Sequence, residues 1–135
     1  MVVDFSNLEL NKLSPIYMQI IRFVKMGILS HTIPIGAEMP SRRVLSALLS
    51  VNPNTIQKAY RQLEEEKLLL SFAGSKSLID YKKEQLIQIR EELVIDETHR
   101  YISSIKGMGM SLEEANHLIS HLWDVERGGE GNEKL

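Results

Sequence analysis

The chain has 135 residues, of which 43% are apolar, and its formal net charge at pH 7 is −2. This length and this apolar share suffice for one folded domain with a small appendage, and they exclude wholesale disorder. The sequence has no cysteine, which excludes disulfides and thiolate metal sites and predicts a cytoplasmic protein.

The first predicted element is a helix that runs from Ser14 to about Ser30. Ser14 followed by Pro15 is a helix-start signal, because a hydroxyl can cap the helix and proline fits its first position. Apolar residues then recur at helical spacing: Tyr17, Ile20, Ile21, Val24, Ile28 and Leu29. The next segment, HTIPIGAEMP at 31–40, contains two prolines and a glycine, so we predict an extended loop.

Two short helices are predicted to follow this loop. Ser41 can cap the first, which ends near Ser50 and has the apolar residues Val44, Leu45, Leu48 and Leu49. Asn52 and Pro53 repeat the cap-plus-proline signal and predict a second helix over about 53–66, with Ile56, Ala59, Tyr60 and Leu63 on its inner side. Helices this short and this close cannot lie antiparallel along their length, so they fit a helix-turn-helix.

A small hairpin is predicted after the second short helix. Strand-like runs at 68–72 and 77–79 are separated by Ala73-Gly74-Ser75-Lys76. Three helices followed by a hairpin is the order of a winged helix-turn-helix. We therefore predict a mostly α fold class, with a winged helix-turn-helix domain and a small two-stranded wing over residues 1–80.

The remaining residues predict a short two-helix dimerisation segment at 81–126 and a flexible tail at 127–135. A long helix from about 83 to 106 is apolar on more than one face, and a second helix begins with the capping-box spacing of Ser111 and Glu114 and ends near Val125. A helix that is apolar on several faces must bury more than one of them, so we expect a symmetric homodimer. The alternative is that both faces pack within one chain. The expected dimer contacts are Leu86, Ile89, Leu93, Tyr101, Ile105, Leu118, Leu122 and Trp123.

The basic residues of the first 80 positions gather in the predicted helix-turn-helix. Residues 38–63 contain four Arg or Lys and one Glu, whereas residues 81–135 contain seven basic and eleven acidic side chains. In such motifs the second helix contacts base edges in the major groove, and the first helix and the wing contact phosphates. We therefore predict a double-stranded DNA partner, and a pseudo-palindromic operator if two chains bind together. The alternative is that these polar side chains are only solvated. The expected DNA contacts are Ser41, Arg42, Arg43, Asn52, Asn54, Thr55, Gln57, Lys58, Arg61, Ser75 and Lys76.

The sequence resembles the GntR family of bacterial transcription regulators, and more narrowly its YtrA subfamily. The resemblance rests on PIYMQI (15–20), GILS (27–30), PIGAEMPSRRVLS (34–46), VNPNTIQKAYRQLEEEKLL (51–69) and the wing, and it covers about residues 13–79. It implies a dimeric DNA-binding winged helix that usually represses transcription, often at operons that encode ABC transporters. By position it implies phosphate and groove contacts for Ser41 and Arg43, base contacts for Pro53, Asn54, Thr55 and Gln57, and the wing tip for Gly74.

Three features depart from the family pattern. Many members have glycine where this chain has Ser50, and serine with positive φ there costs on the order of 1 kcal/mol. Arginines that are common at the positions of Pro53 and Gln57 are absent, which argues against guanine contacts by these residues. In the wing, Lys76 replaces a second glycine and Leu78 replaces an aromatic residue, so we expect the tip to bind differently.

Other function classes have less support. The sequence contains no glycine-rich phosphate loop, no serine elbow and no triad-like spacing, so we predict neither an enzyme nor a cofactor. No stretch approaches the ~18–20 apolar residues of a membrane span, and the N-terminal residues do not resemble a signal peptide. His117 and His121 have the spacing of a chelating pair, which His99 and Glu114 could complete, so a metal-responsive repressor is one alternative. A winged-helix protein-interaction module is the other.

Overall fold

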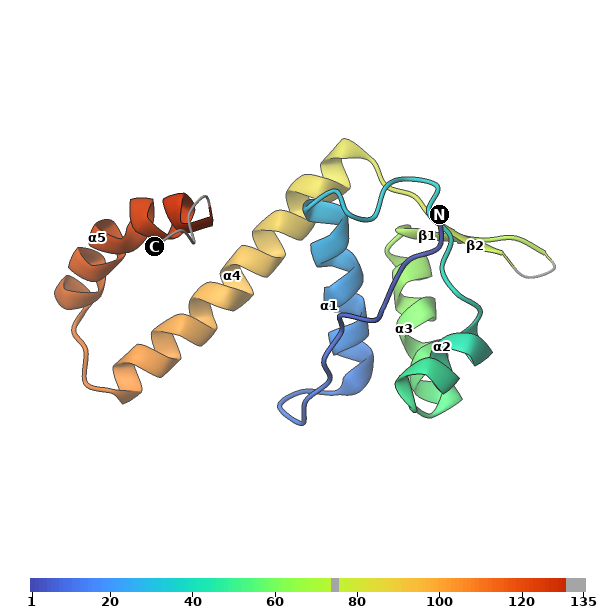
Figure 1. Cartoon of the computed structure of the whole chain (residues 1–135), viewed down its shortest axis with the longest axis horizontal. Coiled ribbons are helices and arrows are strands. Elements are labelled where there is room, and N and C mark those ends of the chain that lie inside the picture. Colours follow the sequence, from blue (N-terminus) through green and yellow to red (C-terminus); the bar gives the residue numbers. More distant parts are fainter. Residues whose placement is uncertain (74–75, 131–135) are drawn as a thin grey trace. The chain divides into compact units, whose positions relative to one another are not determined.

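The computed structural model describes residues 1–73 and 76–130 and contains the predicted helices and hairpin (Figure 1). The elements in chain order are α1 (Ile16–Leu29), α2 (Arg42–Leu49), α3 (Pro53–Glu65), β1 (Leu69–Ser71), β2 (Ser77–Ile79), α4 (Lys83–Gly107) and α5 (Leu112–Glu130). They form two compact units, residues 1–93 and the residues from 94 onward, which are described separately. Among the described residues, no helix has the length and apolar character needed to cross a membrane.

Helix α1 begins one residue later than its sequence signal predicts. Pro15 is the N-cap residue with φ −58° and ψ 140°, and no side chain caps the helix, so the prediction that Ser14 is the cap was wrong. Because ψ of Pro15 is extended, the proline flanks the helix instead of occupying its first turn. The amide of Gln19 secures the entering chain, since its Nε2 donates to the carbonyl oxygens of Asn11 (2.9 Å) and Ser14 (2.8 Å).

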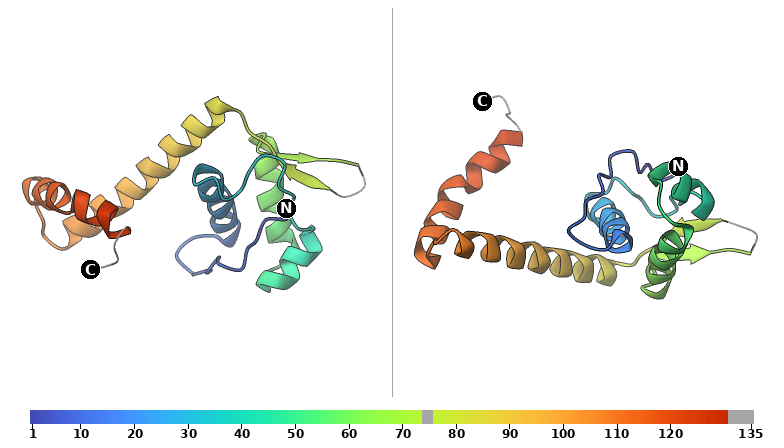
Figure 2. Two further views of the ribbon diagram at one scale, coloured as in Figure 1. Left: turned by 45° about the horizontal axis from the view of Figure 1, so that its top comes forward. Right: turned by 90° about the horizontal axis from the view of Figure 1, so that it is seen from below.

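The hairpin is antiparallel and is extended by two segments that the sequence did not predict to pair. Leu69 pairs with Ile79 and Ser71 with Ser77, and the hairpin projects away from the helices in both views of Figure 2. On the other edge of β2, Ile79 N donates to the carbonyl oxygen of Ala37 (2.8 Å). The predicted loop 31–40 therefore contributes extended backbone, and residues 1–3 pair in turn with Glu38.

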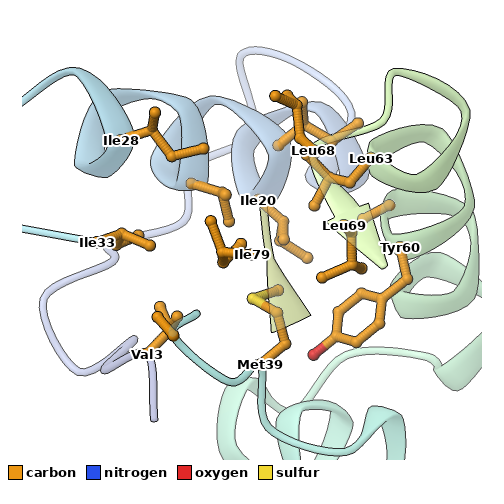
Figure 3. Close-up of a cluster of buried hydrophobic side chains, with 14 of the residues drawn as sticks. Val3, Ile20, Ile28, Ile33, Met39, Tyr60, Leu63, Leu68, Leu69 and Ile79 are labelled. Atoms are coloured by element: carbon orange, nitrogen blue, oxygen red, sulfur yellow. The ribbon is translucent and has the colours of Figure 1, made fainter. Parts of the chain in front are cut away.

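The core of the first unit lies where α1, α3, the hairpin and the N-terminal segment meet (Figure 3). Its largest fully buried side chains are Phe5, Ile20, Val24, Ile28, Leu45, Ile56, Tyr60, Leu63, Leu68, Leu69 and Ile79. They come from positions at helical or strand spacing, which is why each element buries one face. Phe5 precedes every predicted element and still packs on Phe23, with 5.1 Å between the ring centroids.

Helix α2 buries less apolar surface than its sequence pattern predicts. Leu45 is fully buried and Leu49 is half-buried, but Val44 and Leu48 are 54% and 59% exposed. The helix has only eight residues and packs chiefly on α3, so one narrow stripe suffices to hold it. Of the four apolar residues that predict this helix, Val44 and Leu48 thus lie outside the core.

Helix α4 belongs to both compact units. Ile89 and Leu93 are buried in the core of the first unit, and Leu86 packs against it, so this unit extends to Leu93 and not only to residue 80. From Val94 onward the helix belongs to the second unit. The fold thus places residues 81–93 of the predicted dimerisation segment in the first unit.

The second unit contains the rest of α4 and helix α5. The predicted capping box is confirmed: Ser111 N donates to Oε1 of Glu114 (2.8 Å), and Glu114 N donates to Oγ of Ser111 (3.1 Å). Helix α5 continues to Glu130, past the predicted end near Val125, so residues 127–130 of the predicted tail are helical. Residues 131–135 lie outside the described residues.

Candidate nucleic-acid interface

Side-chain caps begin both α2 and α3, and a left-handed residue lies in the turn between the two helices. Ser41 Oγ accepts from Val44 N (3.1 Å), and Asn52 Oδ1 accepts from Asn54 N (2.7 Å), as predicted for both caps. Ser50 has φ 56° and ψ 48°, and it redirects the chain from one helix to the next. Ser50 therefore adopts the positive φ at which serine is strained.

Helix α3 has one fully buried face and one polar face. Ile56, Ala59, Tyr60 and Leu63 are each 0% exposed, which fixes the helix to the core. The opposite stripe follows the helical spacing of three and four residues: Asn54, Gln57, Lys58 and Arg61. Gln57 is half-buried, the other three are exposed, and Thr55 lies half-buried beside the stripe. Hydrogen-bonding groups therefore cover the outer face, as the sequence predicts.

Three exposed cations belong to this polar stripe or to the first turn of α2. Arg43 lies in the first turn of α2, is exposed, and has no ion pair among the described residues. Arg61 is exposed on α3. Lys58 lies over the ring of Tyr17, with its Nζ 4.1 Å from the centroid, which orients the ammonium without neutralising it. The turn and its two helices thus present positive charge next to amide groups.

Arg42 is turned inward, unlike its neighbour. Its Nη2 donates to Oε2 of Glu64 (3.2 Å), and its guanidinium stacks over Tyr60, 4.8 Å from the ring centroid. Its Nε is buried without a hydrogen-bond partner among the described residues. Arg42 therefore joins α2 to α3 within the protein. Since only Nη2 is paired among the described residues and the side chain is about one third exposed, the DNA contact by Arg42 stays a prediction.

The same ion pair reaches the wing. Glu64 also accepts a hydrogen bond from Ser71 Oγ on β1, and Ser71 lies 3.2 Å from Ser77 Oγ on β2. Tyr60 donates its hydroxyl proton to the Pro40 carbonyl (2.6 Å) at the start of α2. Burial raises the pKa of Tyr60 well above its ordinary value, against the smaller opposing effect of Arg42, so this hydroxyl stays a donor. These contacts hold α2, α3 and the wing in one arrangement.

Of the predicted wing contacts, only Lys76 can be placed. Its side chain is exposed directly before β2. Gly74 and Ser75 lie outside the described residues. Leu70 on β1 and Phe72, which follows this strand, are 43% and 53% exposed, so the wing also presents apolar surface.

The predicted dimer contacts fall into two groups. Ile89 and Leu93 are 4% and 6% exposed within the core of the first unit, so their assignment to a subunit contact was wrong. One apolar face of α4 is therefore buried within a single chain. Of the others, Leu118, Leu122 and Trp123 are exposed, and the partly buried ones are Leu86, Tyr101 and Ile105.

The histidine pair has no support as a metal site within one chain. His117 and His121 are exposed on α5. Among the residues that the structure describes, no group of three or more His, Cys, Asp or Glu side chains could hold a metal ion.

Comparison with known families gives the arrangement its context. The family model described as "Bacterial regulatory proteins, gntR family" matches residues 16–79, which span α1 to β2. The winged domain of this chain belongs to the GntR family. The chain is also 29% identical to the HTH-type transcriptional repressor YtrA of Bacillus subtilis (strain 168), over 89% of this chain and 93% of YtrA. That match spans 121 residues, so it reaches beyond the winged unit into the C-terminal helices.

Solved structures agree with the GntR assignment. A GntR family transcriptional regulator from Listeria monocytogenes is 28% identical and has a TM-score of 0.68, and the match covers 83% of this chain and 98% of that one. BusR of S. agalactiae, in complex with its busAB-promotor DNA, has a TM-score of 0.51 at 22% identity, with 85% of this chain and 58% of BusR covered. At that identity the likeness to BusR shows the fold alone.

Several residues that organise this GntR domain were not singled out from the sequence. Glu64 and Ser71 hold Arg42 and the wing, and Tyr17 holds Lys58. None of these pairs has a local spacing signal, because the partners are seven to 41 positions apart along the chain.

Proposed function

We propose that this chain is a sequence-specific DNA-binding transcriptional repressor that acts as a homodimer on a pseudo-palindromic operator. The observation that carries the proposal is the two-sided α3. Its inner face is 0% exposed at four positions, and its outer stripe consists of amides and cations. A helix fixed in this way can enter the major groove without losing core contacts.

The groups on α2 and α3 suit different parts of DNA. Asn54 and Gln57 carry amides that can pair in bidentate fashion with adenine, and Thr55 offers a hydroxyl and a methyl group. Arg43, Lys58 and Arg61 supply charge for phosphates, together with Ser41 at the start of α2. Asn52 keeps its amide donors, since the cap uses only its oxygen. Pro53 offers apolar contact, and the wing residues Gly74, Ser75 and Lys76 complete the proposed interface.

The homodimer is supported by the unburied apolar surface of the second unit. Between 94 and 125, Ala115 is the one buried side chain among the described residues. Large apolar side chains remain exposed there: Val94, Ile95, Ile102, Leu112, Leu118, Ile119, Leu122, Trp123 and Val125. Exposure of these apolar side chains to water is unfavourable, and an apolar surface of this kind marks a protein contact. A second copy of the chain buries this surface symmetrically and brings two copies of α3, the proposed recognition helix, to one operator.

The regulated genes are a finer part of the proposal. The YtrA subfamily that the sequence resembles often acts at operons that encode ABC transporters, and we propose such an operon here. Repression is supported by the match to a repressor over 93% of that protein's length. Transcript levels of a neighbouring transporter operon, compared between cells with and without the gene, test this part.

Selection of DNA by the purified chain tests the central claim. A random-sequence duplex library should yield an enriched inverted repeat, and Asn54→Ala and Gln57→Ala should change which bases are enriched. We expect each variant to lose about 1–3 kcal/mol of discrimination at one position per half-site. Enrichment of no sequence by the wild-type chain would contradict the proposal.

Salt separates DNA binding from a protein-interaction role. Contacts with several phosphates release counterions, so affinity for the selected duplex should fall steeply between low and moderate salt. A partner bound through apolar groups such as Val44 and Leu48 would show little salt dependence. Affinity that does not change with salt, together with recovery of a bound protein instead of DNA, would favour the protein-interaction module.

A further inference from the structure

A buried lysine with two carboxylate partners lies at the base of the recognition helix. Lys25 on α1 is 3% exposed, although its ammonium carries a full charge. Its Nζ lies 2.8 Å from Oε1 of Glu66 and 3.2 Å from Oε1 of Glu92. Glu66 is the C-cap residue of α3, and Glu92 belongs to α4. One ammonium therefore joins three helices, and no part of the DNA-binding surface described above uses it.

Because Lys25 is buried, its ammonium depends on the two carboxylates that face it. A charge taken out of water is costly unless opposite charges meet it at good geometry, so Lys25 holds both carboxylates close. Glu66 and Glu92 are 34% and 50% exposed, which lets water solvate their outer oxygens. Without the ammonium, two like charges would face each other across the gap between α3 and α4 and repel.

A second polar contact joins the same two helices. Gln85 Nε2 donates to the carbonyl oxygens of Glu66 (2.9 Å) and Lys67 (3.1 Å), at the end of α3. Gln85, Ile89 and Glu92 follow one another at spacings of four and three, so one face of α4 makes all these contacts. The apolar residues on that face pack into the core, and the polar contacts join α4 to the C-terminal end of α3.

We propose that Lys25 is a positioning residue for DNA recognition: through Glu92 it holds the first turns of α4 on the winged domain. This inference rests on the proposed homodimer, in which α4 leads to the subunit contact. Firm attachment of α4 then limits how far the two winged domains of a dimer can shift against each other, and hence which half-site spacings the dimer accepts.

Spacing discrimination is the measurement that isolates this role. The probe is the duplex selected from a random library by the wild-type chain, with its spacer lengthened or shortened by two base pairs. Such a change rotates one half-site by about 70° around the DNA axis, and we expect a loss of roughly tenfold or more in affinity. For full-length Lys25→Met and Glu92→Gln, we expect the loss to shrink to about threefold or less, because the clamp between α3 and α4 is broken.

Matched variants separate positioning from folding. Lys83→Met removes a lysine that is exposed at the start of α4 and should keep wild-type discrimination. Lys25→Arg keeps the charge and should restore it. Glu92→Gln changes only a half-exposed side chain, so the test survives even if Lys25→Met folds poorly.

Two different results would separate this inference from the function on which it rests. Wild-type discrimination in both Lys25→Met and Glu92→Gln would overturn the positioning role while leaving the repressor intact. Equal affinity of the wild-type chain for a single half-site and for the paired sites would instead overturn the homodimeric mode of binding.

Discussion

The two units of this chain differ in how far one copy satisfies its own apolar residues. Residues 1–93 enclose a core in which eleven large side chains are almost fully buried. The described part of the second unit, up to residue 125, buries only Ala115 and leaves Trp123 67% exposed. Both units are helical and capped, so secondary structure alone does not separate them. Their difference lies in burial: the first unit encloses its own core, and the second leaves the apolar surface on which the proposed homodimer rests.

The largest expected effect comes from placing a charged side chain on the exposed apolar surface of the second unit. Leu122→Asp should raise the dissociation constant of the dimer more than about a hundredfold, because each copy then buries an unpaired carboxylate. Sedimentation across a range of concentrations measures this. Ser120→Asp places the same charge on the polar side of α5 and should leave association unchanged. An undiminished dimer in Leu122→Asp would show that this surface is covered in another way.

A core substitution probes the first unit. In the Leu122→Asp background, Leu63→Ala should lower the free energy of unfolding by about 2–5 kcal/mol, because a fully buried side chain leaves a cavity. Urea unfolding followed by circular dichroism gives the value. The matched change Leu70→Ala, at a residue 43% exposed on the wing, should cost less than about 1 kcal/mol. Equal costs would contradict the burial contrast.

Adjacent arginines on α2 should act on different quantities. Arg43→Ala should weaken binding to all duplexes by about 1 kcal/mol and reduce the salt slope by about one, since it removes one phosphate contact. Arg42→Ala should instead lower the stability of the first unit by about 1 kcal/mol or less, because its ion pair with Glu64 is about one third exposed. Fluorescence-anisotropy titrations and urea melts separate the two. Unchanged affinity in Arg43→Ala at moderate salt would refute this contact.

The smallest effect is expected at the turn between α2 and α3. Ser50→Gly should stabilise the first unit by about 0.5 kcal/mol, because relief of the left-handed strain exceeds the added entropy of the unfolded chain. Ala47→Gly, in the helical backbone of α2, should instead destabilise it by about 1 kcal/mol. Thermal melts of both variants decide this. A lower melting temperature for Ser50→Gly would mean that the serine side chain stabilises the turn.

Local signals predicted the recognition motif well. The caps at Ser41 and Asn52 depend on contacts with residues two or three positions away, so the sequence contains both partners of each hydrogen bond. The alternation of buried and polar positions on α3 has the same local origin. Ser14 shows the limit of such signals, because a one-residue shift of the helix start left its hydroxyl outside the cap.

Contacts between distant residues could not be predicted in this way. Ile89 and Leu93 form an apolar stripe whether the covering surface is the same chain or a second one, so periodicity alone could not assign them. Arg42 is charged and near a helix start, as a phosphate ligand would be, but Glu64 on the next helix captures it. The pairing of residues 1–3 with Glu38 depends on backbone atoms, which carry no sequence signal.

The exposed Trp123 gives the protein an optical reporter. It is the single tryptophan of the chain, and it lies in α5 of the second unit, which contains none of the residues proposed to touch DNA. Emission of an indole moves to shorter wavelength when water leaves its surroundings, and the tyrosines of the winged domain contribute little when excitation is set to its red edge. Association and dissociation of the subunits can therefore be followed in unlabelled protein, in the presence or absence of duplex.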